Sequence, residues 1–559
     1  MKAVRPITIL CLLLILFFSC GKKEKDQAAS TSIGETRFSA DKPEYGGTLV
    51  RALSGEPVSL QPLYGYSDGA SCEVIIHLFP PLVRKLEDPD RPGFPKLTPV
   101  LAESWSFSPD GRELEFKLRE NVHWEDGVEV TTEDVIFTYQ KAIDHTTKTI
   151  VHYAFSRIDT VLALDKYRFK VFYNQPYVYA VFRWDIGLLP KHILTGKDIN
   201  TNEFNRRPVG YGMFKFVNWA SNEQIIIEAN ENSYWGRPYL DRMIFRIIPE
   251  SAVQILELKA GNLDLVTRLH TTQFVRDLVG PEVEQNINKY EYEDTFMYGL
   301  VFNLKVDLFQ DKRIRQAIYH AIDKQSIIQG VQLGKGRPGW GPIPPESWAH
   351  NSNIKKYPHD PQQALELLAS AGWKDHNGDG FLDQDGKNFE FTALSFQNES
   401  VQQIVTIIQQ QLKKVGIKMK IKVVEWSVYL NSFVAKRNFD VCVTRGGQGV
   451  MDPDLVFTFH SSQIHDTEYN WASYINPTVD TLIEKSLTTF DVDKRKQYFF
   501  KAQQIIAEDV PVIYLYLRNS MLAVNKRVQG VRPLPSPLGF DHNLDYWWIP
   551  KIYQRQKKY

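Results

Sequence analysis

The sequence lacks an excess of charge of either sign. Its 559 residues hold 66 Lys and Arg against 66 Asp and Glu, so the formal net charge is zero. Because proteins that bind nucleic acid usually carry a basic patch or a basic excess, this balance argues against a nucleic-acid partner. The chain also lacks internal repeats and long low-complexity tracts, and its length predicts two or three domains.

Cysteine is scarce as well, with four in the whole chain. Two of them, Cys72 and Cys442, lie far from the N-terminus. In an oxidising compartment they could form a disulfide, or they could remain two separate buried thiols, and only their geometry decides between these outcomes. No Cys/His spacing typical of a metal site occurs, so we expect no cofactor.

The common catalytic motifs are absent too. The sequence contains no HExxH, no GxSxG and no GxxxxGK[ST]. Carboxylates are many, but none is paired in a recognisable acid–base motif. A hydrolase would need a nucleophile and a base, and no such pair is visible. The sequence motifs by themselves therefore give no indication of an enzyme.

Long apolar runs are confined to the N-terminus. A short basic segment precedes an apolar run from Ile7 to Phe18, which is shorter than the roughly 20 residues of a membrane-spanning helix. Ser-Cys-Gly follows, and this order resembles a bacterial lipoprotein signal in which Cys20 is lipidated. An ordinary secretory signal is the alternative. We assign residues 1–19 to the signal peptide and the polar residues 20–40 to a flexible tether.

The most informative segment runs from Leu97 to Tyr139. It reads LTPVLAESWSFSPDGRELEFKLRENVHWEDGVEVTTEDVIFTY. The alternation from Glu113 to Arg119 predicts a strand, and Thr131 marks the start of a capped helix. The residue order resembles the block LA-x-SW…DG…F-x-LR-x-x-V-x-W-x-DG…DV, which is typical of the extracytoplasmic solute-binding proteins of peptide and nickel ABC transporters.

Further segments extend this resemblance over nearly all of the chain from Tyr45 to Tyr546. The segment PVGYGMFKF at 208–216 is similar to the family's P-V-G-x-G segment, and NENSYWGRPY at 230–239 is similar to its N-x-x-Y-W turn. The segment DKRIRQAIYHAID at 311–323 resembles the family's D-x-R-V-R-Q-A helix. Members of the family bind ligands and carry out no chemistry.

The second half of the chain alternates between helical and strand patterns. Ser400 and Gln403 are spaced like a capping box at the start of a helix. We expect another helix from Trp426 to Arg437, a strand from Phe439 to Thr444 and a strand from Pro511 to Leu517. Helices that alternate with strands over short connections predict an α/β lobe with a largely parallel sheet.

The resemblance implies an α/β chain with a periplasmic-binding-protein type II-like fold, two lobes and an inserted extra domain, which makes three domains. The first lobe would be discontinuous and comprise residues 41–60, 190–295 and 518–559. Residues 61–189 would form the inserted extra domain, and residues 296–517 would form the second lobe. In this family the ligand lies between the two lobes, which close over it by a hinge.

The resemblance also locates the position that would bind a ligand amine. Relatives that bind free-amino peptides supply an Asp a few residues before an Asp-Pro pair. Counting back from Pro453, that position is Gly449, so the carboxylate is absent. Burying an unpaired ammonium costs several kcal/mol, and the departure therefore argues against a free ligand amine. The resemblance places Asp452 and Asp454 as structural turn residues.

Arg445 follows the predicted strand Phe439 to Thr444, at the end of the strand where α/β folds place ligands. Its guanidinium could hold a carboxylate or phosphate with two hydrogen bonds, or it could form a salt bridge between the lobes. Gly447 and Gly449 would let a ligand or the opposite backbone approach closely, or they would form a plain flexible loop.

Aromatic and amide side chains complete the predicted ligand-binding set. The resemblance places Trp340 and Trp426 beside the cleft, where either ring could stack on a ligand or instead pack in the core. Asn303 matches a position where the family often has Asn near the cleft, although it could equally bond its own loop. Tyr66 would line the mouth of the cleft.

The segment from Asp375 to Asp383 resembles the front of a calcium loop. Asp375, Asn377, Asp379 and Asp383 stand at the first, third, fifth and ninth positions of such a loop. The closing glutamate is missing, because Gly386 occupies its position. A hairpin turn explains the segment better than a calcium site, and we predict no metal site.

Together these observations predict the substrate-binding lipoprotein of an ABC importer. It would capture an oligopeptide or a related small solute and deliver it to the permease and ATPase subunits. We expect a monomer in the periplasm or cell envelope, anchored to a membrane by the lipid on Cys20. Two alternatives stay open: a binder of a non-peptide solute such as an oligosaccharide, and a surface receptor or chaperone-like lipoprotein that retains the fold.

Overall fold

A large mixed sheet of 11 strands forms the frame of the computed structural model, which describes residues 42–65, 68–88, 90–446, 452–531 and 546–554. Its strands are β1 Thr48–Leu53, β8 Phe214–Ala220, β9 Gln224–Ala229, β10 Arg242–Ile247, β11 Leu265–Val266, β12 Ile287–Phe302, β13 Gly336–Pro338, β16 Glu390–Phe396, β17 Lys418–Val424, β18 Val441–Gly446 and β19 Val512–Asn525. Their order is β17-β16-β18-β12-β19-β11-β1-β10-β9-β8, and β13 pairs with β19.

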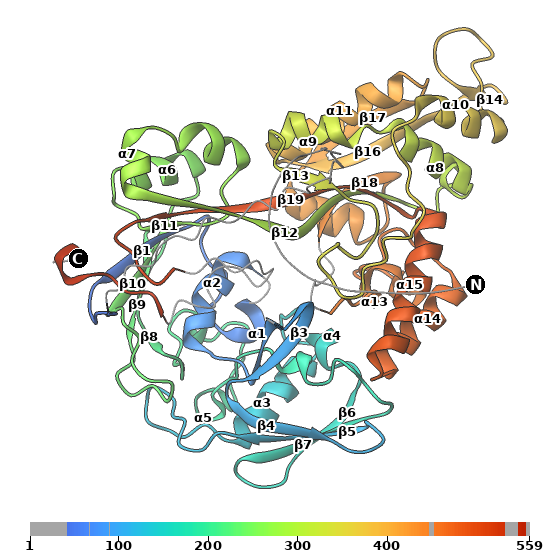
Figure 1. The fold of residues 1–559 in the computed structure, drawn as a ribbon. Helices are drawn as coiled ribbons and strands as arrows, with labels where there is room; N and C mark the ends of the chain where they lie inside the picture. The colour runs from blue at the N-terminus through green and yellow to red at the C-terminus, as the bar shows by residue number, and fades with distance from the viewer. Residues whose placement is uncertain (1–41, 66–67, 89, 447–451, 532–545, 555–559) are drawn as a thin grey trace, which may run out of the picture. The chain divides into compact units, whose positions relative to one another are not determined.

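Two long antiparallel strands, β12 and β19, connect the two halves of this sheet (Figure 1). At one end β12 also pairs with β18, and at the other end β19 pairs with β11. The predicted largely parallel sheet is therefore wrong. β16 does pair in parallel with β17 and β18, but β12 is antiparallel to both of its neighbours. Periodicity in the sequence indicates strands without giving their direction.

The pairing of β12 with β19 is irregular between Glu293 and Met297. The buried carboxylate of Asp294 holds this bulge. It accepts hydrogen bonds from the backbone N–H groups of Thr295 and Phe296, at 2.7 and 3.2 Å, and it forms an ion pair of 3.4 Å with Arg518 on β19. The lobe boundaries predicted after residues 295 and 517 fall at this bulge, and the division into lobes stays a prediction.

Helices and short helical turns surround the sheets or connect their strands. They are α1 Pro62–Gly65, α2 Gly69–Leu78, α3 Thr132–Ile143, α4 His152–Phe155, α5 Lys191–Leu194, α6 Ser251–Lys259, α7 Pro281–Asn286, α8 Lys312–Ala321, α9 Lys324–Gln332, α10 Pro361–Ser370, α11 Glu399–Lys413, α12 Trp426–Val428, α13 Val456–Phe459, α14 Pro477–Thr488 and α15 Val492–Asp509.

Two predicted helices differ in detail from the structure. The N-cap of α11 is Asn398, whose side chain accepts from the Val401 N–H at 3.1 Å, so the capping box at Ser400 is wrong. The predicted helix from Trp426 to Arg437 is also wrong in detail, because α12 gives way to a wider π-helical turn over Tyr429–Val434. In that turn the Ala435 N–H donates to the Leu430 carbonyl, five residues back.

The segment with the strongest family resemblance, Leu97 to Tyr139, contributes two strands to a second, smaller sheet. This sheet has the order β4-β5-β7-β6, with β4 Ala102–Phe107, β5 Glu113–Leu118, β6 Ile158–Ala163 and β7 Arg168–Tyr173. Helix α3 lies beside it (Figure 1), and its predicted N-cap, Thr131, is confirmed with a full capping box. Two hairpins pair β2 Val83–Asp88 with β3 Arg91–Pro99 and β14 Asp383–Gln384 with β15 Lys387–Asn388.

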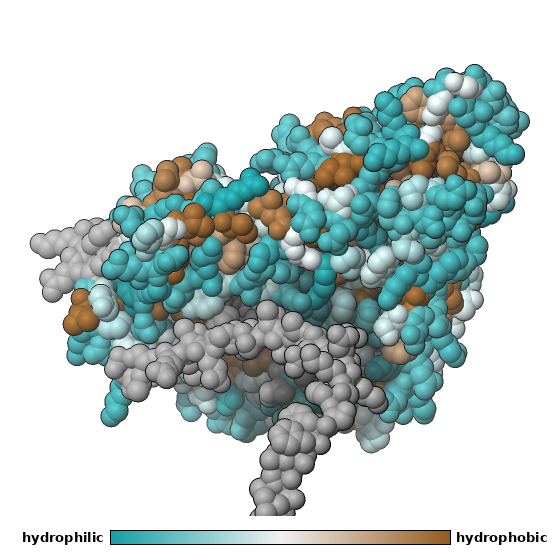
Figure 2. Space-filling model, turned by 45° about the horizontal axis from the view of Figure 1, so that its top comes forward, coloured by the Kyte–Doolittle hydropathy of each residue, from teal (hydrophilic) through white to brown (hydrophobic). Residues whose placement is uncertain are grey.

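The two cysteines of the described chain, Cys72 and Cys442, form no disulfide with each other. Both are free, which confirms two separate thiols, but only Cys442 is buried and Cys72 is partly exposed. The signal peptide, the tether and Cys20 lie outside the described residues. Within the described part of the chain, no helix is long and apolar enough to cross a membrane. The face seen in Figure 2 is mostly hydrophilic, with apolar side chains in separate patches.

Glu125 is a partly buried carboxyl group at the junction between the smaller sheet and the segment before β8. Its Oε1 accepts from the Gly210 N–H at 2.8 Å, and its own N–H donates to the Gly210 carbonyl at 2.9 Å. Burial raises the pKa of this carboxyl to about 7, and the hydrogen bond from Gly210 opposes the rise only in part.

This pKa predicts a pH-dependent stability. Between the ordinary pKa near 4.5 and about 7, folded Glu125 keeps a proton that the unfolded chain has released. The free energy of unfolding should therefore fall as pH rises through this window, by at most roughly 3 kcal/mol from this group. Urea unfolding at pH 5 and pH 7.5 should show that Glu125→Gln removes this part of the slope. The exposed Glu120→Gln should keep the wild-type slope, and an unchanged slope in Glu125→Gln would contradict the assignment.

Candidate functional site

The central strands β18, β12 and β19 form the floor of a cavity at the carboxyl end of β18. Gly299 of β12 lies in the middle of this floor. A Cβ atom there would lie 2.7 Å from the Ile513 carbonyl oxygen and 3.3 Å from Thr444 Cγ2, so any larger residue would push the strands apart. The close packing of the three strands thus depends on glycine at this position.

This cavity, the main chamber, has a volume of about 550 Å³ and a mostly apolar lining. Its wall is rich in aromatic side chains: Trp426, Phe457, Phe459, Tyr469 and Trp471. Two of these are unusually exposed for their size, Trp426 at 41% and Tyr469 at 49%. Among the described residues that line it, none is Asp or Glu. The chamber can therefore take up an apolar group of considerable size.

A second cavity of about 320 Å³, the polar chamber, shares Tyr298 and Arg445 with the main chamber. Its other lining residues include Arg518, His270, Glu399 and the amides Gln332 and Gln403. Burial lowers the pKa of His270, and the charge of Arg518 lowers it further. The polar chamber therefore offers one acid, two guanidinium groups and several neutral hydrogen-bonding groups.

A third cavity, of about 610 Å³, is lined by residues such as His77, Pro80 and Trp235. Its charged groups have partners within the protein. Lys85 lies 3.5 Å from Asp185, and Arg237 bonds Glu231 at 2.8 Å. Because these charges are already neutralised, we take the main and polar chambers, and not this cavity, as the candidate site.

Two of the sequence-predicted site residues meet in the candidate site. Trp426 and Arg445 both line the main chamber, and Arg445 also lines the polar chamber. Arg445 is exposed, and no other residue in the described parts of the chain forms an ion pair or hydrogen bond with its side chain. Among the described residues the guanidinium therefore forms no salt bridge between the lobes, and it lines both chambers.

Trp340 lies outside the lining of both chambers, although its near neighbour Pro342 lines the main chamber. The ammonium of Lys324 lies 3.5 Å from the centre of the Trp340 ring and donates to the Gly339 carbonyl at 2.6 Å. Lys324 is buried, and desolvation lowers the pKa of its ammonium. In this arrangement Trp340 packs against the buried Lys324 side chain and lines neither chamber.

Asn303 is buried and lines neither chamber. Its Nδ2 donates to the carbonyl oxygens of Arg437 and Phe439, at 3.0 and 2.7 Å. Its Oδ1 accepts from the Lys305 N–H at 3.1 Å. The side chain thus fixes the turn that leads into β18, and only its bond to Lys305 lies in its own loop, as the alternative from the sequence had it.

Three other predicted ligand-binding residues, Tyr66, Gly447 and Gly449, lie outside the described residues. Just after that region, Asp452 and Asp454 have the structural roles expected of them. Asp452 forms a buried ion pair of 2.8 Å with Arg495, and Asp454 pairs with Arg183 at 2.7 Å. Neither aspartate lines the main or the polar chamber, so neither replaces the missing carboxylate at Gly449.

In the segment from Asp375 to Asp383, the acidic side chains accept hydrogen bonds from backbone N–H groups of the same segment. Asp375 accepts from the N–H groups of Gly378 and Gly380, at 2.7 and 3.0 Å, and Asp379 accepts from the Phe381 N–H at 2.8 Å. Within the described ranges, no group of three or more His, Cys, Asp or Glu side chains is placed to hold a metal. The Asn377 side chain likewise bonds the Asp379 N–H, at 2.9 Å.

Sequence reasoning missed most of the residues that line the chambers. Phe457, Tyr469 and Trp471 follow Pro453 in a part of the sequence that is rich in aromatic residues. This richness could have indicated an aromatic wall of the site. Arg518 and His270 gave no such signal. They reach the polar chamber from positions far apart in the chain, which only the pairing of β12 with β19 and β19 with β11 brings together.

Known proteins match this chain over most of its length. The family described as bacterial extracellular solute-binding proteins, family 5 middle, matches residues 96–466. The oligopeptide-binding protein AppA of Bacillus subtilis (strain 168) is 32% identical over an alignment of 566 positions, gaps included. The alignment covers 98% of this chain and 99% of that protein.

Solved structures agree with this match. The structure of AppA from Bacillus subtilis in complex with a nonapeptide has a TM-score of 0.77 at 31% identity, over 91% of this chain and 100% of that chain. NikZ from Campylobacter jejuni in complex with Ni(L-His) also has a TM-score of 0.77, at 29% identity, over 90% of this chain and 99% of that chain.

These matches confirm two predictions. The similar structures have a two-lobe type II fold with an extra domain, which is the predicted fold class. The matching proteins are substrate-binding proteins of ABC transporters and not enzymes, which agrees with the predicted binding function. The family match covers more than half of the chain. The chain therefore belongs to family 5 of the bacterial extracellular solute-binding proteins, which bind their solutes outside the cytoplasm.

Proposed function

We propose that this chain is the substrate-binding lipoprotein of an ABC importer and that it binds an oligopeptide across the main and polar chambers. The observation that carries the proposal is the position of Arg445. Its exposed guanidinium stands where an apolar chamber meets a polar one and, in the described part of the chain, it has no protein partner. A peptide offers both an apolar side chain and an anionic or carbonyl oxygen to such a junction.

The main chamber supports an apolar side chain as one part of the ligand. Trp426 and Tyr469 expose large areas of aromatic ring to it. Covering that area stabilises the complex by roughly 25 cal/mol for each Å² removed from water. Trp426 already stacks on Tyr429 with ring centres 5.6 Å apart, so its ring is held in place before the ligand arrives.

The polar chamber supports an anionic end of the ligand beside this apolar group. A carboxylate held by Arg445 would gain charge-assisted hydrogen bonds, and Arg518 lines the same chamber. With Gly449 in place of the amine-binding acid, Glu399 is the acidic residue that lines the polar chamber in the described chain. An amphiphilic solute that is not a peptide is the second candidate, and the missing acid at Gly449 favours it.

A ligand in these chambers would touch all three predicted domains. Ile150 of the inserted domain lines the main chamber, Leu269 of the first lobe lines the polar chamber, and Arg445 of the second lobe lines both. Ligand contacts to both lobes would stabilise the closed state, with the bulge at Asp294 in β12 as the hinge. The closed protein, tethered through residues 20–40 to the lipid on Cys20, would then deliver the ligand to the permease.

Native mass spectrometry of the purified chain from Asp41 is the direct test of the ligand class. We expect a population with bound peptides that are released on denaturation, since oligopeptides should remain in a partly enclosed site. Released sugars or other non-peptide solutes would instead support the second candidate. A protein that is empty and shows no thermal shift with peptide or sugar libraries would contradict the importer proposal.

Arg445 can be tested with two synthetic nonapeptides that differ only in a free or an amidated C-terminus. Amidation should weaken binding to the wild type by about tenfold or more, because a charge-assisted hydrogen bond contributes roughly 1.5–3 kcal/mol. In Arg445→Gln, amidation should have little further effect on affinity measured by calorimetry. Arg276→Gln, an exposed arginine of the first lobe that lines neither chamber, is the matched control. Equal discrimination by Arg445→Gln and wild type would remove Arg445 from the site.

A further inference from the structure

The wall of the main chamber contains a very short helix, α13, with little contact area of its own. Phe457, Thr458 and Phe459 of α13 all line the chamber. A four-residue helix has few internal hydrogen bonds, so its position must be fixed by its surroundings. Two carboxylates near α13 contact its ends, and both of them pair with arginines from a distant part of the chain.

Asp454 fixes the first end of α13. Its Oδ1 accepts from the Val456 N–H at 3.0 Å, which satisfies a free donor at the start of the helix. Its Oδ2 accepts from Nη2 of Arg183 at 2.7 Å, and Arg183 lies 271 residues earlier in the chain. The pair is well shielded, with side-chain exposures of 17% for Arg183 and 12% for Asp454. Its attraction is therefore screened less than that of a surface pair.

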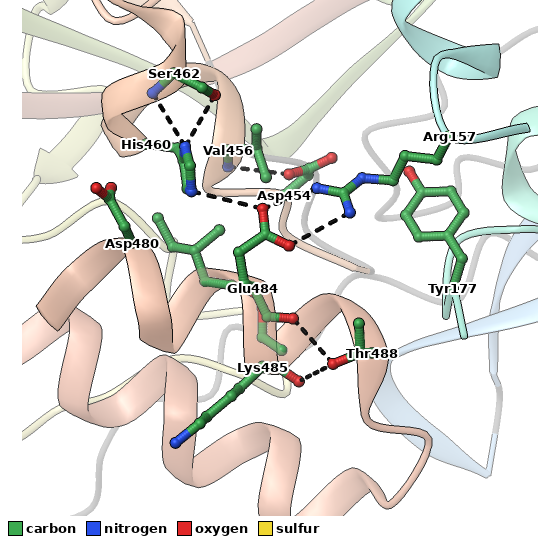
Figure 3. A network of polar contacts seen from close by, with 12 residues as sticks. Arg157, Tyr177, Asp454, Val456, His460, Ser462, Asp480, Glu484, Lys485 and Thr488 are labelled. Carbon is green, nitrogen blue, oxygen red and sulfur yellow. Dashed lines mark hydrogen bonds and ion pairs between the residues drawn. The ribbon is translucent and has the colours of Figure 1, made fainter. Parts of the chain in front are cut away.

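Glu484 fixes the second end through His460, the residue that follows α13 (Figure 3). Nε2 of His460 lies 3.5 Å from Oε1 of Glu484. Both oxygens of Glu484 accept from the guanidinium of Arg157, at 3.0 and 3.3 Å. In Figure 3, Arg157 reaches Glu484 from the opposite side to His460. Glu484 is 38% exposed, so this second contact should be the weaker of the two.

Tyr177 lies between the two arginines and orders them. Nε of Arg183 donates to the Tyr177 hydroxyl at 2.8 Å, and the guanidinium of Arg157 lies 5.5 Å from the centre of the Tyr177 ring. The neighbouring Tyr179 donates from its hydroxyl to the Pro453 carbonyl, next to Asp454. Arg157, Tyr177, Tyr179 and Arg183 thus form one preorganised surface that faces both ends of α13.

We propose that Arg183 and Arg157 are positioning residues for the ligand site, because they clamp the two ends of α13 and so set the place of the chamber wall. They touch no ligand and act through Asp454 and Glu484. The inserted segment would then contribute to affinity at a distance, in addition to the direct contact of Ile150 with the chamber. This inference rests on the proposed function for its affinity effect, but the clamp on α13 can be measured without any ligand.

The first measurement is hydrogen–deuterium exchange of the unliganded protein. The N–H groups of Phe459 and His460 donate to the Leu455 and Val456 carbonyls, at 3.0 and 3.1 Å. In Arg183→Met these two amides should exchange about tenfold faster, and in Arg157→Met by a smaller factor, because local opening becomes easier. Arg183→Lys, which keeps the charge, should recover much of the protection. Unchanged exchange in Arg183→Met would overturn the proposal.

The second measurement is affinity for a synthetic nonapeptide with a central phenylalanine. Arg183→Met should weaken binding by about tenfold, in the range of mutations that act through a coupled element. Arg168→Met is the matched control, since Arg168 forms exposed ion pairs with Asp165 and Glu115 on the smaller sheet. Faster exchange with unchanged affinity would overturn the role of the clamp in ligand binding. If the wild type bound no peptide, the proposed function would fail, and the exchange measurement would still decide whether the clamp exists.

Discussion

The antiparallel pairing of β12 with β19 is the constraint on which the rest of the structure depends. These two strands hydrogen-bond along most of their length, and each one also pairs with the strands of one half of the large sheet. Backbone hydrogen bonds in a central strand cannot be lost without leaving buried polar groups unpaired. The two halves of the sheet are therefore tied together by main-chain bonds, while the bulge at Asp294 makes the pairing irregular near the middle.

The candidate site follows from this arrangement. β18 ends beside the point where β12 leaves one half of the sheet for the other, so Arg445 emerges at the junction of the two chambers. The strands below are too close for a side chain at Gly299, which keeps the floor flat. The wall is then built from loops and short turns, where binding residues are commonly placed on a rigid scaffold. In a site of this kind, substitutions in the wall can change which ligand binds, while the floor stays the same.

The similar proteins of known structure agree with a constant floor and a variable wall. One is in complex with a nonapeptide and another with Ni(L-His), yet both have the same TM-score of 0.77 to this chain. The fold therefore does not specify the ligand, and the wall residues must do so. In this chain the wall combines Trp426, Tyr469 and the helix α13, which two arginines from a distant segment hold in place.

The sequence by itself determined the family, the fold class and several local structures. The residues from Leu97 to Tyr139 carry fixed types at fixed spacing, and Thr131 caps a helix through contacts with its own neighbours. Interactions of this kind lie within a few residues, so a local pattern is enough to predict them. Arg445 was located from its place at the end of a predicted strand, and Trp426 was located from the family resemblance.

Only the tertiary structure decided the direction of the strands and the composition of the site. Arg518 and His270 reach the polar chamber through the pairing of β12 with β19 and of β19 with β11. Asn303 bonds the turn before β18. The sequence could not show this, because its partners at Arg437 and Phe439 lie more than a hundred residues away. Such contacts depend on which surfaces meet after the chain folds, and neither periodicity nor residue type along the sequence records that meeting.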